Sequence, residues 1–98
     1  MAQEKKIQTD IIDYLTSINA SVTKYNVNGF GRKGEPDLFV SLLHPDHKYP
    51  IAIYIEVKDP DGEESTIQRI KRERRTSAGH LSIVADSVSV VRNFIKSL

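Results

Sequence analysis

An acidic and a basic side chain, Glu56 and Lys58, stand two positions apart near the end of one apolar segment. If residues 51–58 form a strand, every second side chain shares a face, so Glu56 and Lys58 point the same way. Asp37 opens another apolar segment, residues 37–43. Antiparallel pairing of the two segments would bring the start of one beside the end of the other. Two carboxylates and an ammonium group would then gather at one edge of a sheet.

Two neighbouring carboxylates repel each other unless a proton or a cation lies between them. Mg²⁺ suits such a pair because it prefers oxygen ligands, binds one or two carboxylates and keeps several waters. Such an ion can lower the pKa of a water and neutralise charge on a phosphoryl group. Lys58 could stabilise negative charge in the transition state or act as a base. Nearby carboxylates raise a lysine pKa, which favours the first role. For this spacing alone, a surface ion pair is the alternative.

Helical spacing and capping residues predict three helices that frame these segments. Residues 3–18 form an amphipathic helix that stops at Asn19. A cap at residues 65–66 opens the second helix, which ends before Gly79, and residues 88–98 form the third.

Alternating and β-branched segments predict four strands. These are residues 21–27, 37–43, 51–58 and 80–85, with a glycine-rich loop at 28–34 and a turn at 44–47. The order is therefore α-β-β-β-α-β-α, which indicates an α/β fold with a mixed four-stranded sheet flanked by helices. The three successive strands favour a meander, and the strand–helix–strand unit favours a parallel neighbour.

Two motifs around the acidic residues resemble a nuclease signature. Gly34-Glu35-Pro36-Asp37-Leu38, followed after a hairpin by Ile55-Glu56-Val57-Lys58, is similar to the motif of the PD-(D/E)XK nucleases. It looks most like the virus-type replication-repair nuclease (VRR-NUC) branch, in its stand-alone phage or bacterial form. The resemblance covers most of the chain and implies a PD-(D/E)XK restriction-endonuclease-like core. It also implies an endodeoxyribonuclease that hydrolyses phosphodiester bonds with Mg²⁺ or Mn²⁺.

The same resemblance implies roles for individual residues. Asp37 and Glu56 are expected to bind the metal, with the backbone carbonyl of Val57 as a further ligand. Lys58 is expected to stabilise charge or to activate water.

Two helical residues match family positions and are expected to assist catalysis. Glu4 lies on the inward stripe of the first helix, although a favourable charge near a helix N-terminus would explain it equally well. Gln68, on the second helix, is expected to position water or a DNA phosphate. The alternative for Gln68 is a solvated helix residue.

Positive charge is concentrated on the second helix, where only Ile67 and Ile70 are large apolar anchors. Five cations stand there against Glu73, namely Arg69, Lys71, Arg72, Arg74 and Arg75. This pattern favours DNA phosphate binding, with a solvated charged face as the alternative. We expect the phosphate contacts to come from Arg69, Lys71, Arg72 and Arg75, together with Arg32 and Lys33 of the glycine-rich loop. No aromatic series interleaves the cations, so backbone recognition is expected rather than base reading.

Length and composition fit one domain, residues 1–98, of a globular protein. There is no cysteine, which suits a reducing cytoplasm, and the resemblance implies that of a bacterial or phage-infected cell. No apolar segment reaches membrane-spanning length, and no small-molecule cofactor is expected. The acids of residues 59–64 are expected to be solvated. The net charge of +1 means that any attraction to DNA depends on how charge is distributed.

The expected activity is that of a structure-selective endonuclease, similar to a Holliday-junction resolvase, acting on branched DNA as a homodimer. Apolar residues near the hairpin, Leu42, Leu43 and Tyr49, would suit a dimer contact or ordinary core packing. A flap or nicking endonuclease is the enzymatic alternative. A non-catalytic DNA-binding module of the same fold is the alternative from another class, and metal-dependent cleavage would separate the two.

Overall fold

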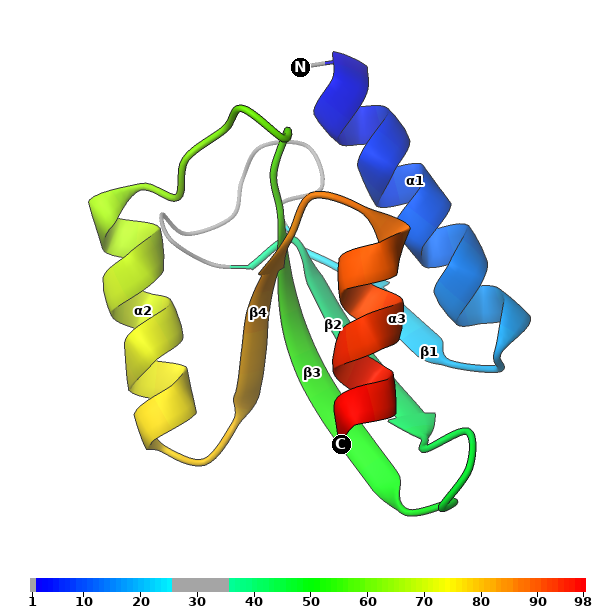
Figure 1. The fold of residues 1–98 in the computed structure, drawn as a ribbon. Coiled ribbons are helices and arrows are strands. Elements are labelled where there is room, and N and C mark those ends of the chain that lie inside the picture. Colours follow the sequence, from blue (N-terminus) through cyan, green and yellow to red (C-terminus); the bar gives the residue numbers. More distant parts are fainter. Residues whose placement is uncertain (1, 26–35) are drawn as a thin grey trace.

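The structure, a computed structural model, describes residues 2–25 and 36–98 (Figure 1). Within these residues the elements follow the expected order, α-β-β-β-α-β-α. The helices are α1 (Ala2–Ser17), α2 (Thr66–Ser77) and α3 (Val88–Ser97). The strands are β1 (Ser21–Lys24), β2 (Leu38–Leu43), β3 (Pro50–Val57) and β4 (Leu81–Ala85). The predicted α/β fold class is therefore confirmed.

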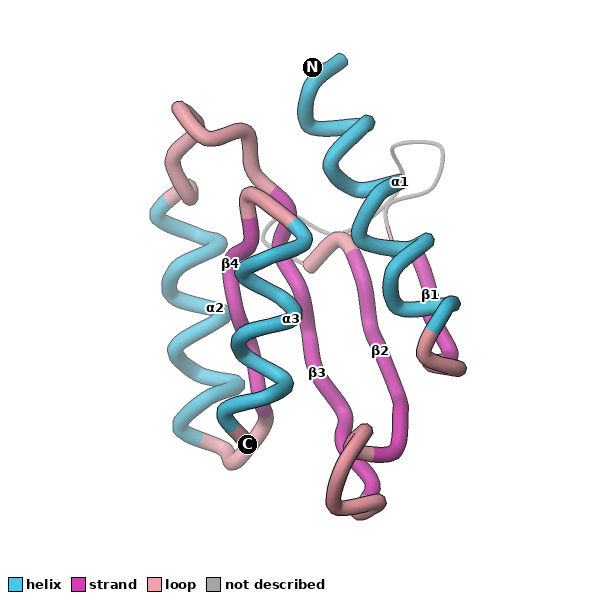
Figure 2. Tube along the Cα trace, turned by 45° about the vertical axis from the view of Figure 1, so that its right-hand side comes forward, coloured by secondary structure: helices cyan, strands magenta, loops and turns pink. Residues whose placement is uncertain are grey.

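The four strands form one mixed sheet in the order β1-β2-β3-β4 (Figure 2). The pairs β1–β2 and β2–β3 are antiparallel, as expected for a meander, and β3–β4 is parallel. A parallel pair needs a crossover connection, and α2 supplies it. In the β2–β3 hairpin Leu38 lies opposite Ile55, and the N–H of Asp37, just before β2, donates to the carbonyl of Ile55, so Asp37 lies beside the end of β3 that carries Glu56.

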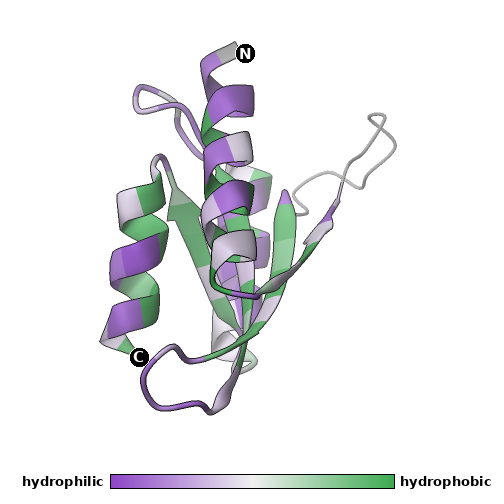
Figure 3. Ribbon diagram, turned by 90° about the vertical axis from the view of Figure 1, so that its right-hand side faces the viewer, coloured by the Kyte–Doolittle hydropathy of each residue, from purple (hydrophilic) through white to green (hydrophobic). Residues whose placement is uncertain are grey.

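One face of the sheet carries the hydrophobic core. Alternate side chains of β2 and β3 point into it, and two helices, α1 and α3, cover it (Figure 3). Its fully buried members are Leu38, Val40, Ile53, Ile55 and Val57 from the sheet, Ile11 and Leu15 from α1, and Val91 and Ile95 from α3. Because the period-two alternation puts the odd-numbered residues of β3 in this core, Glu56 belongs to the opposite face.

Helix α1 ends where the sequence predicts. Asn19 adopts the left-handed backbone conformation, with φ of 65°, and the N–H of Ala20 donates to the carbonyl of Leu15 over 3.0 Å. This pattern satisfies carbonyl groups that a helix end leaves unpaired. Helix α2 ends in the same way at Gly79, whose φ is 98°.

Helix α2 differs from the expectation in what holds it. The prediction that Ile67 and Ile70 anchor the helix was wrong, because their side chains are 45% and 40% exposed and no residue of the helix is buried. The helix packs against β4, beside the face opposite the core, and polar side chains make its contacts with the sheet. Its hydrophobic pattern was therefore a poor guide to which side faces the protein.

Candidate active site

Asp37 lies directly before β2 and extends the hydrogen-bond ladder of the hairpin. Its backbone N–H donates to the carbonyl of Ile55 over 3.1 Å. Its side-chain Oδ2 accepts from the backbone N–H of Val57 over 2.7 Å. The carboxylate thus pairs the last N–H of β3 on this side, and the half-buried Asp37 side chain is fixed at the end of the hairpin.

Glu56 is a buried carboxyl group, 4% exposed, next to Asp37. The pKa of Glu56 is raised from 4.5 to about 8, mainly by burial and then by the negative charge of Asp37 and a hydrogen bond with its carboxyl group. Lys58 acts in the opposite direction and lowers this pKa, while the charge of Glu64 raises it. In the metal-free protein the two carboxyl groups therefore hold a proton near neutral pH, at a place where a cation could replace it.

Gln68 joins the start of α2 to Glu56. Its Oε1 accepts from the backbone N–H of Ser65, while Ser65 Oγ accepts from the backbone N–H of Gln68, which forms a capping box. The Nε2 group of the same residue donates to Glu56 Oε2 over 3.0 Å. Only a side chain with both an acceptor and a donor can make these contacts together.

Lys58 and Glu4 line a shared depression at the end of β3. This cavity has a volume of about 460 Å³, and Gln3, Asp59 and Glu63 also line it. Glu4 is half-buried in the first turn of α1. The structure thus brings Glu4 to the side of Lys58, and it gives no contact between Glu4 and the Asp37–Glu56 pair.

The donor set fits a divalent cation that keeps most of its own waters. Within residues 2–25 and 36–98 no group of three or more histidine, aspartate or glutamate side chains is arranged to hold a metal ion. Mg²⁺ needs only one or two carboxylates. Asp37 and Glu56 supply two, and the raised pKa of Glu56 is what an acid pair without a cation should have.

The cations expected to bind DNA have different surroundings. Arg32 and Lys33 lie outside the described residues. Arg69 forms an exposed ion pair with Glu73, and Lys71 is half-buried. Arg72 and Arg75 contact residues of this chain, as described below. None of these observations tests DNA binding, which stays a prediction.

Glu64 was missed by the sequence reasoning, which expected the acids of residues 59–64 to be solvated. Both of its carboxylate oxygens accept from Arg72, over 2.8 and 2.9 Å, and its side chain is 13% exposed. This expectation was therefore wrong for Glu64. Glu64 and Arg72 are eight positions apart, and local helical rules single out only pairs three or four positions apart, so the sequence carried no signal for this pair.

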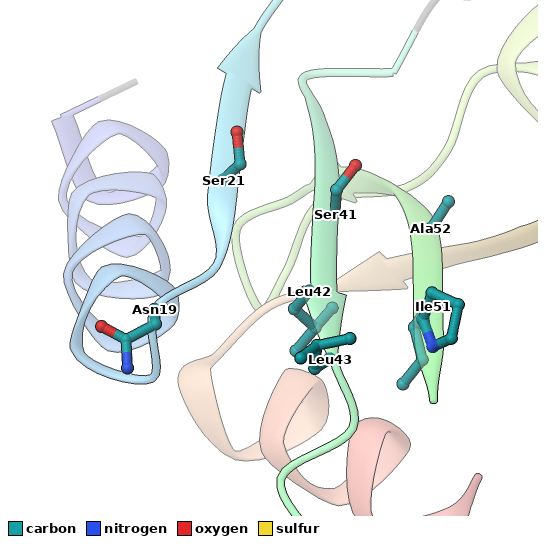
Figure 4. Close-up of a pocket in the computed structure, with 8 residues that line it drawn as sticks. Asn19, Ser21, Ser41, Leu42, Leu43, Ile51 and Ala52 are labelled. Carbon is teal, nitrogen blue, oxygen red and sulfur yellow. The ribbon is translucent and has the colours of Figure 1, made fainter. Parts of the chain in front are cut away.

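Another cavity, of about 510 Å³, lies at the far end of the hairpin (Figure 4). Two serines, two leucines, an isoleucine, a proline, an alanine and an asparagine line it, and none of these side chains is an acid or a base. It therefore offers no acid–base or metal chemistry. Near this end, Leu43 and Tyr49 are 59% and 40% exposed, whereas Leu42 is only 7% exposed. Leu42 is therefore a core residue and not part of an exposed apolar surface.

Comparisons with known proteins agree with this architecture. The structure is similar to a solved structure described as a VRR_NUC domain, with a TM-score of 0.76 and 25% sequence identity. The similarity covers 96% of this chain and 95% of the other. No family model and no curated protein matches the chain. The chain thus has the fold of a VRR_NUC domain, and the resemblance found from two short motifs is confirmed.

Proposed function

We propose that this protein is a DNA endonuclease of the PD-(D/E)XK type that depends on Mg²⁺ or Mn²⁺. One observation carries the proposal: Asp37 and Glu56, far apart in sequence, meet at the end of the β2–β3 hairpin, where the Asp37 carboxylate accepts from the N–H of Val57, the residue between Glu56 and Lys58. Perturbed carboxyl groups that cluster with a cation are typical of active sites. The fold similarity to a VRR_NUC domain, which extends over nearly the whole chain, supports the assignment.

Asp37 and Glu56 would hold the metal ion, and Val57 would add its backbone carbonyl. The N–H and C=O of a strand residue point to the same side, so the Val57 carbonyl is directed toward Asp37, as its N–H is. When bound, Mg²⁺ or Mn²⁺ would polarise a water and neutralise charge on the phosphodiester.

Lys58 would stabilise the negative charge that develops on the phosphate or activate the attacking water. Support for this role comes from its position two residues after Glu56 and from its charge, which lowers the pKa of Glu56. Gln68 would hold the Glu56 carboxylate in one orientation through its amide. Glu4 would assist from the neighbouring depression, where it lies beside Lys58.

A non-catalytic DNA-binding module of the same fold is the alternative from another class. The free-energy cost of burying Glu56 argues against this alternative, because burial and the nearby Asp37 both disfavour the charged form of its carboxyl group. A structural role alone would be served at least as well by an uncharged side chain. An acid pair that is costly without metal is better explained by chemistry with metal.

For the substrate, we propose branched DNA cut by a homodimer, as in Holliday-junction resolvases. A two-fold dimer supplies two sites related by the symmetry of a four-way junction. Leu43 and Tyr49, exposed near the tip of the hairpin, are candidate contact residues. Flap or nicking activity needs a single cut and a single site, so it stays the alternative.

A cleavage assay tests the function and ranks the substrates. Labelled four-way junction, flap, nicked and plain duplex DNA are incubated with the protein in Mg²⁺, Mn²⁺ or EDTA. We expect metal-dependent cleavage, strongest on the junction. Binding of these DNAs without cleavage in any metal would favour the non-catalytic module, and preference for the flap or the nick would favour the alternative enzyme.

Light scattering at micromolar concentration, with and without junction DNA, tests the dimer. We expect a two-fold species at least on the junction. A protein that stays monomeric in both conditions and still cuts efficiently would favour the flap or nicking activity.

A further inference from the structure

Two arginines of α2 are neutralised by acids of this chain. Arg69 pairs with Glu73 one turn away, at 4.0 Å on the solvent side. Arg72 binds Glu64 through two nearly parallel hydrogen bonds of 2.8 and 2.9 Å, and this bonding raises the pKa of Arg72 above its ordinary value. Bidentate pairing with a carboxylate occupies the same donors that would bind a phosphate.

Arg75 has different partners. Its guanidinium carbon lies 5.2 Å from the centre of the Tyr54 ring, and its Nε lies 3.5 Å from Ser82 Oγ. Among residues 2–25 and 36–98, no carboxylate lies within ion-pair distance of Arg75. A ring and a hydroxyl hold this guanidinium in place without neutralising its charge.

The Tyr54 ring is itself fixed on the sheet. The Phe39 ring lies 4.9 Å from it on the neighbouring strand, and the His80 ring meets it edge-on at 5.6 Å. Aromatic pairs in these arrangements contribute beyond simple burial. The guanidinium of Arg75 therefore lies on a platform made of the Tyr54 ring and the two rings that pack against it, Phe39 and His80.

This platform lies on the same sheet face as the carboxyl pair. Tyr54 precedes Glu56 by two positions on β3, so their side chains share a face and their backbones are roughly 7 Å apart. Helix α2 follows the same stretch of β3: Gln68 contacts Glu56, and Arg75, two turns further along the helix, contacts Tyr54. The separation of roughly 7 Å between Tyr54 and Glu56 is comparable with that of neighbouring phosphates along a DNA strand.

We propose that Arg75, seated on Tyr54, binds a DNA backbone phosphate one or two nucleotides from the bond cut at Asp37 and Glu56. The inference rests on the proposed nuclease function, and it separates the cations of α2 by role. Arg75 is the phosphate-binding and substrate-positioning residue, whereas Arg72 fastens Glu64 and the loop before α2. The recognition is of a phosphate and not of a base.

The chain contains a matched control. Arg92 of α3 lies over the Tyr14 ring at the same 5.2 Å, on the side of the sheet that carries the core. Arg92→Gln therefore removes one positive charge and one arginine–tyrosine contact, as Arg75→Gln does. Thermal unfolding of both variants establishes whether either loses its fold.

Binding is first measured in EDTA, where no cleavage is expected, by fluorescence anisotropy of a labelled duplex over a series of salt concentrations. Arg75→Gln should weaken binding by roughly ten- to a hundredfold, and lower the log–log salt slope by about 0.9. Arg92→Gln should change neither quantity. Equal effects of the two variants, or an unchanged slope for Arg75→Gln, would overturn the proposal.

The position of the phosphate is found with four-way junctions that carry one neutral methylphosphonate at successive positions from the branch point. For the wild-type protein, one substitution near the cut should weaken binding, and Arg75→Gln should be insensitive to that same substitution. If the two proteins respond alike at every position, Arg75 binds no particular phosphate and the proposal fails.

The platform is tested with Tyr54→Phe and Tyr54→Leu. Phenylalanine keeps a ring beneath the guanidinium and should keep wild-type affinity, whereas leucine should weaken binding as Arg75→Gln does. Unchanged binding by the leucine variant would show that the ring does not position Arg75. All these readouts are independent of cleavage, so a failure of the nuclease proposal in Mg²⁺ or Mn²⁺ is distinguishable from a failure of the Arg75 assignment.

Discussion

Helices α2 and α3 both begin with a serine cap, but α3 packs on the sheet through apolar side chains and α2 through polar ones. Ser65 caps α2 and Ser87 caps α3, each accepting a backbone N–H from three residues on. Helix α3 buries Val91 and Ile95 completely, whereas α2 buries no residue. Apolar burial is the main source of stability, so α3 maintains the fold. Helix α2 is attached through polar groups near the carboxyl pair, so its contacts mainly serve the site.

The largest effect should come from the carboxyl pair that α2 faces. Asp37→Asn and Glu56→Gln keep the shape of each side chain but remove a metal-binding charge, so cleavage should be abolished while the fold is kept. Cleavage of labelled DNA and circular dichroism measure the two properties. Asp13→Asn, at an exposed site on α1, is the control and should cut normally. Turnover close to the wild type in either site variant would contradict the active-site assignment.

Truncation of an isoleucine on each helix tests the contrast in stability. Ile95→Ala on α3 should lower the free energy of unfolding by about 2–5 kcal/mol, because it removes buried methyl groups and leaves a cavity. Ile70→Ala on α2 should change it by less than about 0.5 kcal/mol, because that side chain is 40% exposed and lies outside the hydrophobic core. Urea unfolding measures both values. Similar losses would show that α2 contributes to the core after all.

Lys58→Ala should lower the turnover number by about 10²–10³, the usual effect of removing one group that stabilises transition-state charge. Metal affinity, measured by calorimetric titration, should change much less. Lys96→Ala on α3 removes the same charge far from the carboxyl pair and should leave turnover unchanged. A defect of Lys58→Ala confined to metal affinity would mean that Lys58 acts on the ion and not on the phosphate.

The raised pKa of Glu56 predicts how stability depends on pH without metal. The folded protein keeps a proton on Glu56 that the unfolded chain has lost, between pH 4.5 and about 8. This contribution is complete below the unfolded pKa and is lost as pH rises through the folded one. Its size is on the order of a few kcal/mol. Urea unfolding in EDTA at both ends of this range measures it.

Two comparisons check the source of this pH dependence. Glu56→Gln cannot titrate, so its stability should be higher than that of the wild type at the alkaline end and should vary less with pH. Mg²⁺ should restabilise the wild type there and have little effect on the variant. Parallel pH profiles of the two proteins would assign the dependence to other groups.

The smallest effect separates the two tasks of Gln68. Gln68→Glu keeps an acceptor for the N–H of Ser65 but loses the donor to Glu56 and adds a third acid beside it. Gln68→Ala loses both contacts without adding charge. Because both variants lose the bond to Glu56, both should cut about tenfold more slowly than the wild type, since residues that hold a metal ligand contribute effects of this order. Wild-type turnover in both variants would show that the bond from Gln68 to Glu56 is incidental.

The sequence predicted the fold and the meeting of the two carboxylates well, because both follow from local periodicity. Period-two alternation assigns Glu56 to a face, and a hairpin between two strands brings Asp37 back beside it. The contacts of α2 did not follow from the sequence. Ile67 and Ile70 have the spacing of an apolar stripe, but the sheet beside α2 offers polar partners. The bonding of Arg72 to Glu64 and the contact of Arg75 with Tyr54 depend on the tertiary structure, which sequence periodicity does not predict.

The register of the β2–β3 hairpin has a consequence for insertions and deletions. Asp37 and Glu56 lie near each other because Leu38 pairs with Ile55, and the face on which each β3 residue lies follows from that register. One residue inserted into β3 just before Glu56 would turn Glu56 toward the core and put the inserted residue beside Asp37. Such an insertion would separate Glu56 from Asp37 although both residues are still present in the chain. The strand can vary in composition along its polar face, but its length in residues cannot change by one.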